Sequence, residues 1–105
     1  MLQQLKELHL DGCDNFTNIT LPNKLVTINE HLFLGCDKLE NVVIPNSVTT
    51  IGHQAFSACE SLMEINIPNS VTNINTAAFS ECINLRTIKI PDNVTIIEGL
   101  TFDRL

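Results

Sequence analysis

Basic residues are scarce in this chain of 105 residues. Six lysines and arginines stand against twelve aspartates and glutamates, which gives a formal net charge of -6. A nucleic-acid-binding surface needs a basic stripe that neutralises phosphates, so the composition argues against nucleic acid as a partner. The same excess of acidic residues argues against binding to an anionic membrane surface.

Long apolar runs are also missing. The longest span only a few residues, as at 42–44, whereas a membrane-spanning helix needs about 20. Residues 1–12 have neither the basic stretch nor the apolar stretch of a signal peptide. We therefore expect no membrane span and no signal peptide in this sequence, which leaves the compartment unspecified.

Motifs for common chemistries are absent too. There are only four glycines and no glycine-rich phosphate loop. The four cysteines lie 23 residues apart, so no C-x-x-C pair exists and zinc binding is disfavoured. No nucleophile, base and orienting group can be assigned from the sequence. We expect no catalytic residue, no cofactor, no metal site and no enzymatic activity.

What the sequence does contain is a repeat of 23 residues. Counted from each cysteine, the units are 13–35, 36–58, 59–81 and 82–104, without insertions. Proline, isoleucine and phenylalanine recur at fixed positions in every unit, and 44% of the chain is hydrophobic, enough for a core. The shared positions include Cys13, Cys36, Cys59 and Cys82, then Pro22, Pro45, Pro68 and Pro91, then Ile28, Ile51, Ile74 and Ile97, then Phe33, Phe56, Phe79 and Phe102.

Residues 1–12 continue the same register as half a unit. Leu2 takes the place of Val48, and Leu10 takes the place of Phe56. We therefore expect a single domain over residues 1–105, cut from a longer array of repeats. Neither end carries the polar terminal unit that repeat proteins need for solubility, which predicts association through the ends as an alternative.

One unit predicts one turn of a solenoid. Ile65 and Ile67 alternate with polar neighbours, as in a short strand, and Pro68 ends that strand because it lacks an N–H. Residues 48–51 favour a second short β-like run, and residues 53–59 favour a helical turn. One unit cannot bury its apolar face alone, whereas stacked units cover the apolar faces of one another. The fold class we predict is an α/β or mainly β right-handed solenoid with a parallel sheet on one side.

The repeat resembles the BspA-like class of leucine-rich repeats. The pattern L-x-x-I-x-I-P-x-x-V-x-x-I-x-x-x-A-F-x-x-C is matched by Leu62, Ile65, Ile67, Pro68, Val71, Ile74, Ala78, Phe79 and Cys82. The resemblance implies a curved superhelix with a concave parallel sheet and with short β-like runs and helical turns on the convex side. It also implies a binding module at a cell surface, attached to a host or matrix protein.

Positions that vary between units point outward from the predicted strands. Because the structural positions stay fixed while these change, they suggest a recognition surface, although an ordinary solvated sheet face is an equal alternative. The candidate partner-binding residues are Asn18, Thr20, Glu40, Asn41, Val43, Met63, Glu64, Asn66, Arg86, Thr87 and Lys89.

Other recurring polar residues have simpler interpretations. The cysteine column predicts buried free thiols that pack as small hydrophobes, because stacked neighbours point in parallel. We expect the histidines to be solvated, and the acidic positions after each cysteine to form a solvated edge rather than a calcium site. Three N-x-S/T sequons, at Asn15, Asn18 and Asn93, matter only in a eukaryotic secretory pathway. The column Thr49, Thr72 and Thr95 is broken by Val26, and the neighbouring column Thr27, Thr50, Asn73 and Ile96 is broken too. Both breaks disfavour a regular hydroxyl array that binds ordered water or carbohydrate.

The sequence therefore predicts a protein-binding or adhesion module that presents a variable sheet surface. The alternative is a structural module that assembles into homo-oligomers end to end.

Overall fold

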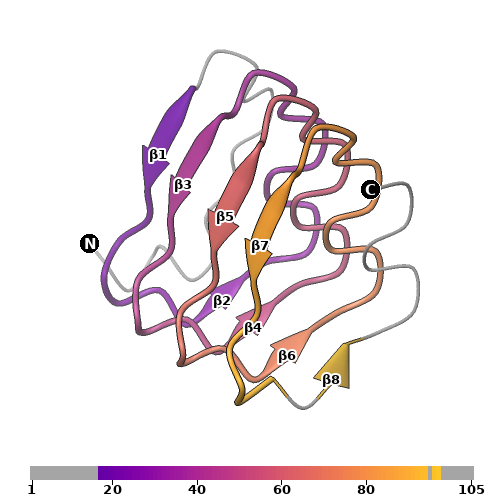
Figure 1. The fold of residues 1–105 in the computed structure, drawn as a ribbon. Helices are drawn as coiled ribbons and strands as arrows, with labels where there is room; N and C mark the ends of the chain where they lie inside the picture. The colour runs from indigo at the N-terminus through magenta and orange to yellow at the C-terminus, as the bar shows by residue number, and fades with distance from the viewer. Residues whose placement is uncertain (1–16, 95, 98–105) are drawn as a thin grey trace.

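A computed structural model describes residues 17–94, 96 and 97, with side chains described for 17–94. Two rows of short strands run through it (Figure 1). The front row consists of β1 (Asn18–Thr20), β3 (Asn41–Val43), β5 (Glu64–Asn66) and β7 (Thr87–Lys89). The second row consists of β2 (Thr27–Ile28), β4 (Thr50–Ile51), β6 (Asn73–Ile74) and β8 (Ile96–Ile97).

All paired strands are parallel, and every pair is offset by one repeat. In the second row, Thr27 pairs with Thr50 and Thr50 with Asn73, which gives the continuous order β2-β4-β6-β8. In the front row, Ile19 pairs with Val42 and Ile65 with Ile88. The 23-residue period of the sequence is thus the register of the sheets, and we call each 23-residue winding a coil.

The front row is interrupted in its middle. β1 pairs with β3 and β5 pairs with β7, but no hydrogen-bonded ladder joins β3 to β5, although the two strands lie side by side (Figure 1). We call this place the seam. Hydrogen bonds between the same two coils persist elsewhere, from Thr72 N to Thr49 O (2.9 Å) and from Phe56 N to Ala78 O (2.8 Å).

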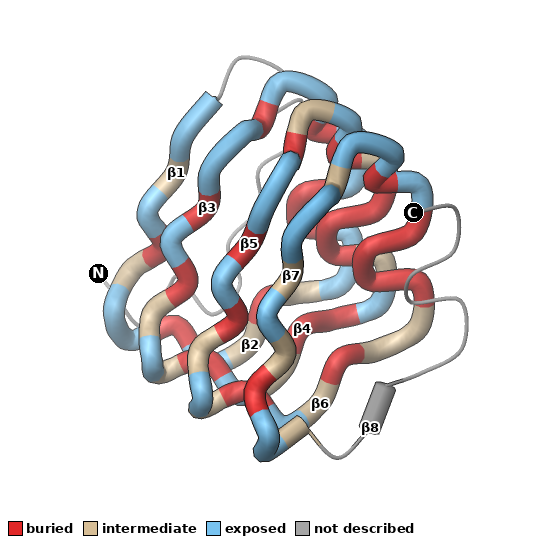
Figure 2. Tube along the Cα trace, in the orientation of Figure 1, coloured by how far each residue is buried: buried red, intermediate tan, exposed pale blue. Residues whose placement is uncertain are grey.

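The core lies between the two strand rows and the turns that close each coil (Figure 2). The aromatic rings of Phe33, Phe56 and Phe79 are fully buried and stack with centroids 5.1 and 5.3 Å apart. Repeat columns fill the rest, since residues one period apart pack on one another. The fully buried members are Leu25, Ile28, Cys36, Leu39, Val48, Ile51, Ala55, Cys59, Leu62, Val71, Ile74, Ala78 and Cys82.

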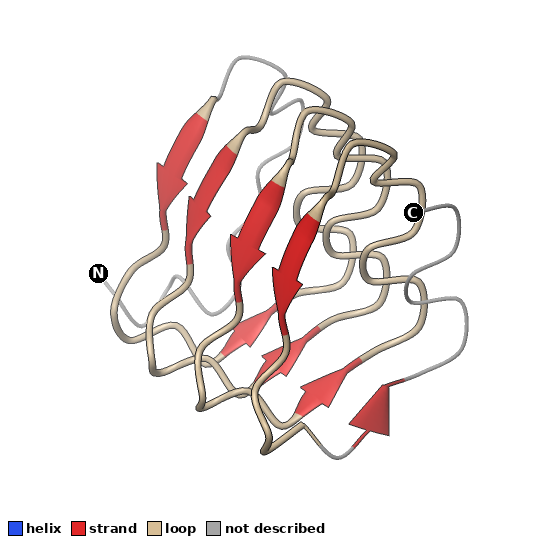
Figure 3. Ribbon diagram, in the orientation of Figure 1, coloured by secondary structure: helices blue, strands red, loops and turns tan. Residues whose placement is uncertain are grey.

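The third side of each coil is a chain of turns, so the expected helical turns are not confirmed. Residues 30–35, 53–58 and 76–81 are turns, and the described residues contain no helix (Figure 3). Within one coil, Ala55 N donates to Gly52 O and Ser57 N to Gln54 O. The amides between them, such as Phe56 N, instead donate to the next coil. Every second amide therefore donates its hydrogen bond to the next coil, so the continuous ladder of hydrogen bonds that a helix needs cannot form.

Backbone dihedrals reinforce this pattern. His31, Gln54 and Ala77 occupy equivalent positions and all have φ between 54° and 64°. At the end of the turns, Gly35 has φ 73°, and its equivalents Ala58 and Glu81 have φ 61° and 59°. Left-handed residues interrupt a right-handed helix. Only one of these six positions holds glycine, so the composition of the segment misleadingly favoured a helix.

Side-chain hydrogen bonds link the proline corners of adjacent coils. Ser47 Oγ donates to Leu25 O and Ser70 Oγ donates to Val48 O, each at 2.6 Å. Asn93 stands at the equivalent position, and its Nδ2 instead donates to Asn69 O at 3.2 Å, two residues before the equivalent carbonyl. These bonds satisfy carbonyls of the preceding coil and hold adjacent corners together.

The predicted domain of residues 1–105, its initial half unit and the membership of a longer array are not tested by this geometry. The hand of the winding and its concavity also stay predictions. Residues 1–12 and the apolar end residues Leu2, Leu10, Phe102 and Leu105 lie outside the described part of the chain.

Candidate functional site

The candidate surface is formed by the outward side chains of the front row, which we call the strand face. Each front strand points its central residue, such as Val42 or Ile65, toward the core and its two flanking residues toward solvent. All eleven candidate residues are exposed, as expected. They are Asn18, Thr20, Glu40, Asn41, Val43, Met63, Glu64, Asn66, Arg86, Thr87 and Lys89.

Within each half of the strand face, side chains from adjacent coils lie beside one another. Asn18 pairs in register with Asn41, and Asn41 Nδ2 donates to Asn18 Oδ1 at 2.7 Å. On the other side of the seam, Glu64 is in register with Thr87 and Asn66 with Lys89. The structure thus brings the candidates together into one exposed strip across four coils.

Charge is distributed unevenly along this strip. The first coil contributes only neutral side chains, the middle coils contribute Glu40 and Glu64, and the last contributes Arg86 and Lys89. These four charged groups form no ion pair with other described side chains. Because no described side chain neutralises them, these exposed charges can contribute to recognition of a partner with complementary charge.

Two large apolar side chains are exposed on the strand face. Val43 is 55% exposed and Met63 is 48% exposed. They do not occupy the same position of the repeat, because Val43 is equivalent to Asn66 and Met63 is equivalent to Glu40. Single exposed apolar residues are ordinary on a protein surface. The strand face is therefore a mixed surface rather than a hydrophobic groove.

The cysteine column differs from the sequence-based expectation at one position. Cys59 and Cys82 are free and buried, but Cys36 is disulfide-bonded, with its partner outside the described residues. The prediction of free thiols is therefore wrong at Cys36. The thiols of Cys59 and Cys82 donate to the carbonyls of Phe33 (3.2 Å) and Phe56 (3.0 Å) in the preceding coil.

Burial makes both free thiols poor nucleophiles. It raises the pKa of Cys82 to about 11, against a small opposing effect of a backbone hydrogen bond. Burial, followed by the neighbouring Cys82, raises the pKa of Cys59 further. Because the thiolate is the reactive form, these cysteines are structural rather than catalytic.

The remaining polar candidates lie on other surfaces. His31 and His53 are exposed, as are Asp37 and Glu60, which follow the cysteines. Across residues 17–94, no group of three or more His, Cys, Asp or Glu side chains is arranged to hold a metal ion. No helix in the described part of the chain is long and apolar enough to cross a membrane.

Two of the three sequons fall within the described residues. Asn18 is exposed, but its side chain accepts the hydrogen bond from Asn41. Asn93 is exposed and donates to Asn69 O. Asn15 lies outside the described residues.

Comparison with known proteins places this arrangement in a family. The family model described as "BspA type Leucine rich repeat region (6 copies)" matches residues 2–105. A search of curated proteins finds no match.

Solved structures share the fold over nearly the whole chain. A leucine-rich repeat protein from Bacteroides ovatus is 28% identical, with a TM-score of 0.85 over 94% of this chain and 25% of that one. The T. pallidum leucine rich repeat protein is 25% identical, with a TM-score of 0.74 over 83% of this chain and 54% of that one. A leucine rich cell surface protein from Faecalibacterium prausnitzii is 25% identical, with a TM-score of 0.73 over 85% of this chain and 30% of that one.

This chain thus spans between a quarter and about half of the length of those structures. Leucine-rich repeat proteins generally serve as binding modules rather than catalysts, in agreement with the exposed strip of variable side chains. By its repeat pattern, its parallel strands in 23-residue register and the match over residues 2–105, the chain belongs to the BspA-type leucine-rich repeat family.

Proposed function

We propose that the strand face binds a protein partner, as an adhesion-type module at a cell surface. The observation that carries the proposal is the contrast between the two sides of each front strand. The inward residues repeat the same apolar types, whereas the outward residues change from coil to coil, and their charged groups form no ion pair with another described side chain. A rigid frame with a variable exposed strip is the arrangement expected of a recognition surface.

The cell-surface location is supported by one similar structure, the Faecalibacterium prausnitzii protein, which is described as a leucine rich cell surface protein. A host or extracellular-matrix protein is the partner class that fits such a location. The charge pattern adds a constraint, because a partner docked along the strip meets Glu40 and Glu64 first and Arg86 and Lys89 last. The partner surface is therefore expected to be basic where it faces Glu40 and Glu64 and acidic where it faces Arg86 and Lys89.

A binding panel tests the proposal directly. Purified extracellular-matrix proteins are immobilised, and the association of this protein is followed by biolayer interferometry at two salt concentrations. The variant Glu40→Lys/Glu64→Lys reverses the charge beside the seam, and Arg86→Glu is a second, independent reversal. The control is Glu60→Lys, which makes the same change at an exposed residue outside the strand face.

The proposal predicts that a member of the panel binds, that both strand-face variants weaken binding at least tenfold, and that Glu60→Lys does not. Equal binding by all variants would place the contact elsewhere. The alternative, assembly through the ends of the chain, predicts self-association that rises with concentration and ignores these substitutions. Light scattering over a dilution series separates that outcome from partner binding.

A further inference from the structure

A depression of about 450 Å³ opens on the outer side of the second strand row, away from the strand face. Its lining spans three successive coils and contains no apolar side chain apart from the methyl groups of threonine. The lining residues are Thr27, Asn29, Glu30, Thr50, Gly52, His53 and Asn75.

The depression exists because one repeat column lacks a side chain. The residue that follows the buried isoleucine of the second row is Asn29 in one coil, Gly52 in the next and Asn75 in the third. Gly52 therefore places no side chain between two asparagines that stand two inter-strand spacings apart, roughly 10 Å. The neighbouring column contributes the paired Thr27 and Thr50 to the wall.

Gly52 also allows an unusually close approach of two coils. A Cβ atom at this position would lie 2.7 Å from both Glu30 N and Ile28 O. Gly52 N donates to that same Ile28 O at 2.8 Å. The floor of the depression is thus backbone, and it is fixed by a contact that no other residue type permits without a shift.

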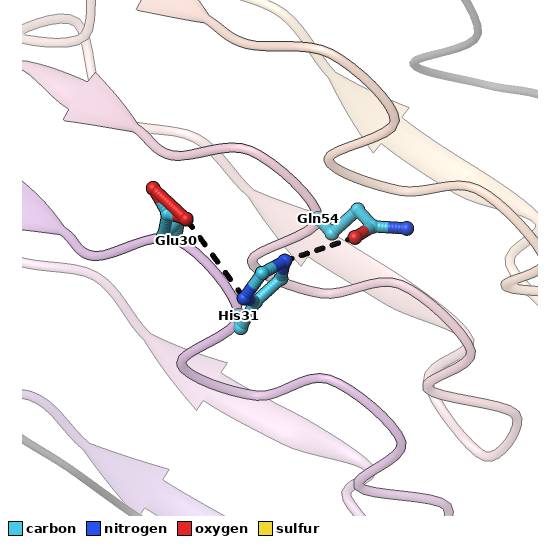
Figure 4. Close-up of polar contacts among 3 residues, drawn as sticks. All are labelled: Glu30, His31 and Gln54. Carbon is cyan, nitrogen blue, oxygen red and sulfur yellow. Dashed lines mark hydrogen bonds and ion pairs between the residues drawn. The ribbon is translucent and has the colours of Figure 1, made fainter.

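The rim is held in place by contacts on its outer side. Glu30 Oε2 lies 3.9 Å from His31 Nδ1, and His31 Nε2 lies 3.0 Å from Gln54 Oε1 (Figure 4). The ring of His31 meets the ring of His53 edge to face, with centroids 5.6 Å apart. Glu30 and His53, the two rim residues, are therefore both packed against His31.

The chemistry of the lining narrows the class of ligand. An anion is disfavoured because the lining holds a carboxylate, Glu30, and no lysine or arginine. A divalent cation is disfavoured because that carboxylate is single and no described group of three ligands exists. A purely apolar ligand is disfavoured because the lining holds no aliphatic or aromatic hydrocarbon side chain, so the hydroxyl, carboxylate and imidazole groups of the walls would lose water without gaining a partner.

What remains is a neutral molecule rich in hydroxyl groups. Threonine hydroxyls both donate and accept hydrogen bonds, a carboxylate accepts two, and imidazole adds a donor or an acceptor. Such a set matches neighbouring hydroxyls on a sugar ring. We propose that the depression formed by Thr27, Thr50, Gly52, Glu30 and His53 is a binding site for one saccharide residue. This site is separate from the strand face, and it does not depend on the proposed protein partner.

The test is a titration of the isotope-labelled protein followed by amide NMR. Glucose, galactose, mannose and N-acetylglucosamine are added singly, and inorganic phosphate and calcium chloride serve as ligands of the excluded classes. A shallow, open site implies weak binding, with a Kd of about 1 mM. We expect one sugar to shift the amides of residues 27–30, 50–53 and 75 in a saturable way, and phosphate and calcium to shift none of them. The Kd of the tetramer of that sugar is then compared with the Kd of the single sugar. Equal values indicate that the site takes a free sugar or a chain end, and a lower Kd for the tetramer indicates a sugar within a polysaccharide chain.

The decisive variant is Thr50→Val, which removes one hydroxyl, keeps the shape and suits a strand. It should weaken sugar binding about fivefold, the effect of one lost hydrogen bond. The matched control is Thr72→Val, the same change at an exposed residue outside the lining, which should leave the Kd unchanged. No saturable shifts with any of the sugars, or equal affinity of Thr50→Val and the parent, would overturn the proposal. Saturation by phosphate or calcium would overturn the choice of ligand.

Discussion

The stacked phenylalanines provide a quantitative test of how the coils hold together. Phe56 is the middle ring, 5.1 Å from Phe33 at an interplanar angle of 13° and 5.3 Å from Phe79 at 1°. The substitution Phe56→Leu keeps most of the buried apolar volume but removes both ring-to-ring contacts. Each aromatic pair is worth about 0.5–1.5 kcal/mol beyond area burial, so the loss should be about 1–3 kcal/mol.

Phe33→Leu serves as an internal comparison. Within the described residues Phe33 stacks on one ring only, so the same reasoning gives about half the loss. Both variants are measured by urea unfolding, in which a small protein has an m value of about 1–3 kcal/mol per molar. The midpoint for Phe56→Leu should therefore fall by about 1 M, and the midpoint for Phe33→Leu by about half as much. Met63→Ala, an exposed substitution, should shift it little.

Stacking ranks the loss in Phe56→Leu above that in Phe33→Leu, and two results would contradict that ranking. If Phe56→Leu unfolds at the same urea concentration as the parent, the stacked rings contribute only burial, which leucine replaces. If Phe33→Leu costs as much as Phe56→Leu, the loss does not scale with the number of stacked neighbours. Either result would refute stacking as a source of cohesion between coils.

Three further outcomes follow from burial, titration and hydrogen bonding. Ile74 is fully buried, so Ile74→Ala should lower the free energy of unfolding by about 2–5 kcal/mol, and a melting temperature within a degree of the parent would contradict its inward position. The Cys82 pKa of about 11 lies above its unfolded value near 9.0, so the folded state retains the proton longer and stability falls as pH rises from 9 to 11. Chemical unfolding across that range should show a smaller loss for Cys82→Ala than for the parent, and an identical loss would contradict this assignment. The amides of β5 should exchange with deuterium faster than those of β4, because β5 has no ladder to β3 whereas β4 is paired on both sides; equal protection would mean that the seam is closed in solution.

The inward columns could be predicted from the sequence because the repeat displays each one several times. Ile28, Ile51 and Ile74 recur at the same spacing, and the structure buries all three completely. The outward positions followed from the same alternation. The exposure of Glu40, Glu64 and Arg86 was therefore predictable, whereas their role in binding stays a prediction.

The turns could not be predicted from composition. Residues 53–59 are rich in small residues that favour a helix, but hydrogen bonds to the next coil compete for every second amide. Gln54 and Ala77 adopt left-handed dihedrals without being glycine, so residue type carried no signal there. The seam between β3 and β5 has no counterpart in the repeat pattern. Gly52, in contrast, does break the column of Asn29 and Asn75, and that break was visible in the sequence.

The alternating use of amides in the turns has a consequence for how such a chain can change length. Donors that stay within the coil and donors that leave it follow each other with a period of two. Deleting or inserting one residue there would exchange the two sets, so amides meant for the neighbouring coil would point back into their own turn. A coil that is one residue longer or shorter could therefore not form the normal hydrogen bonds with the coils on either side of it. Length variation in this protein is therefore expected to occur by gain or loss of whole 23-residue coils.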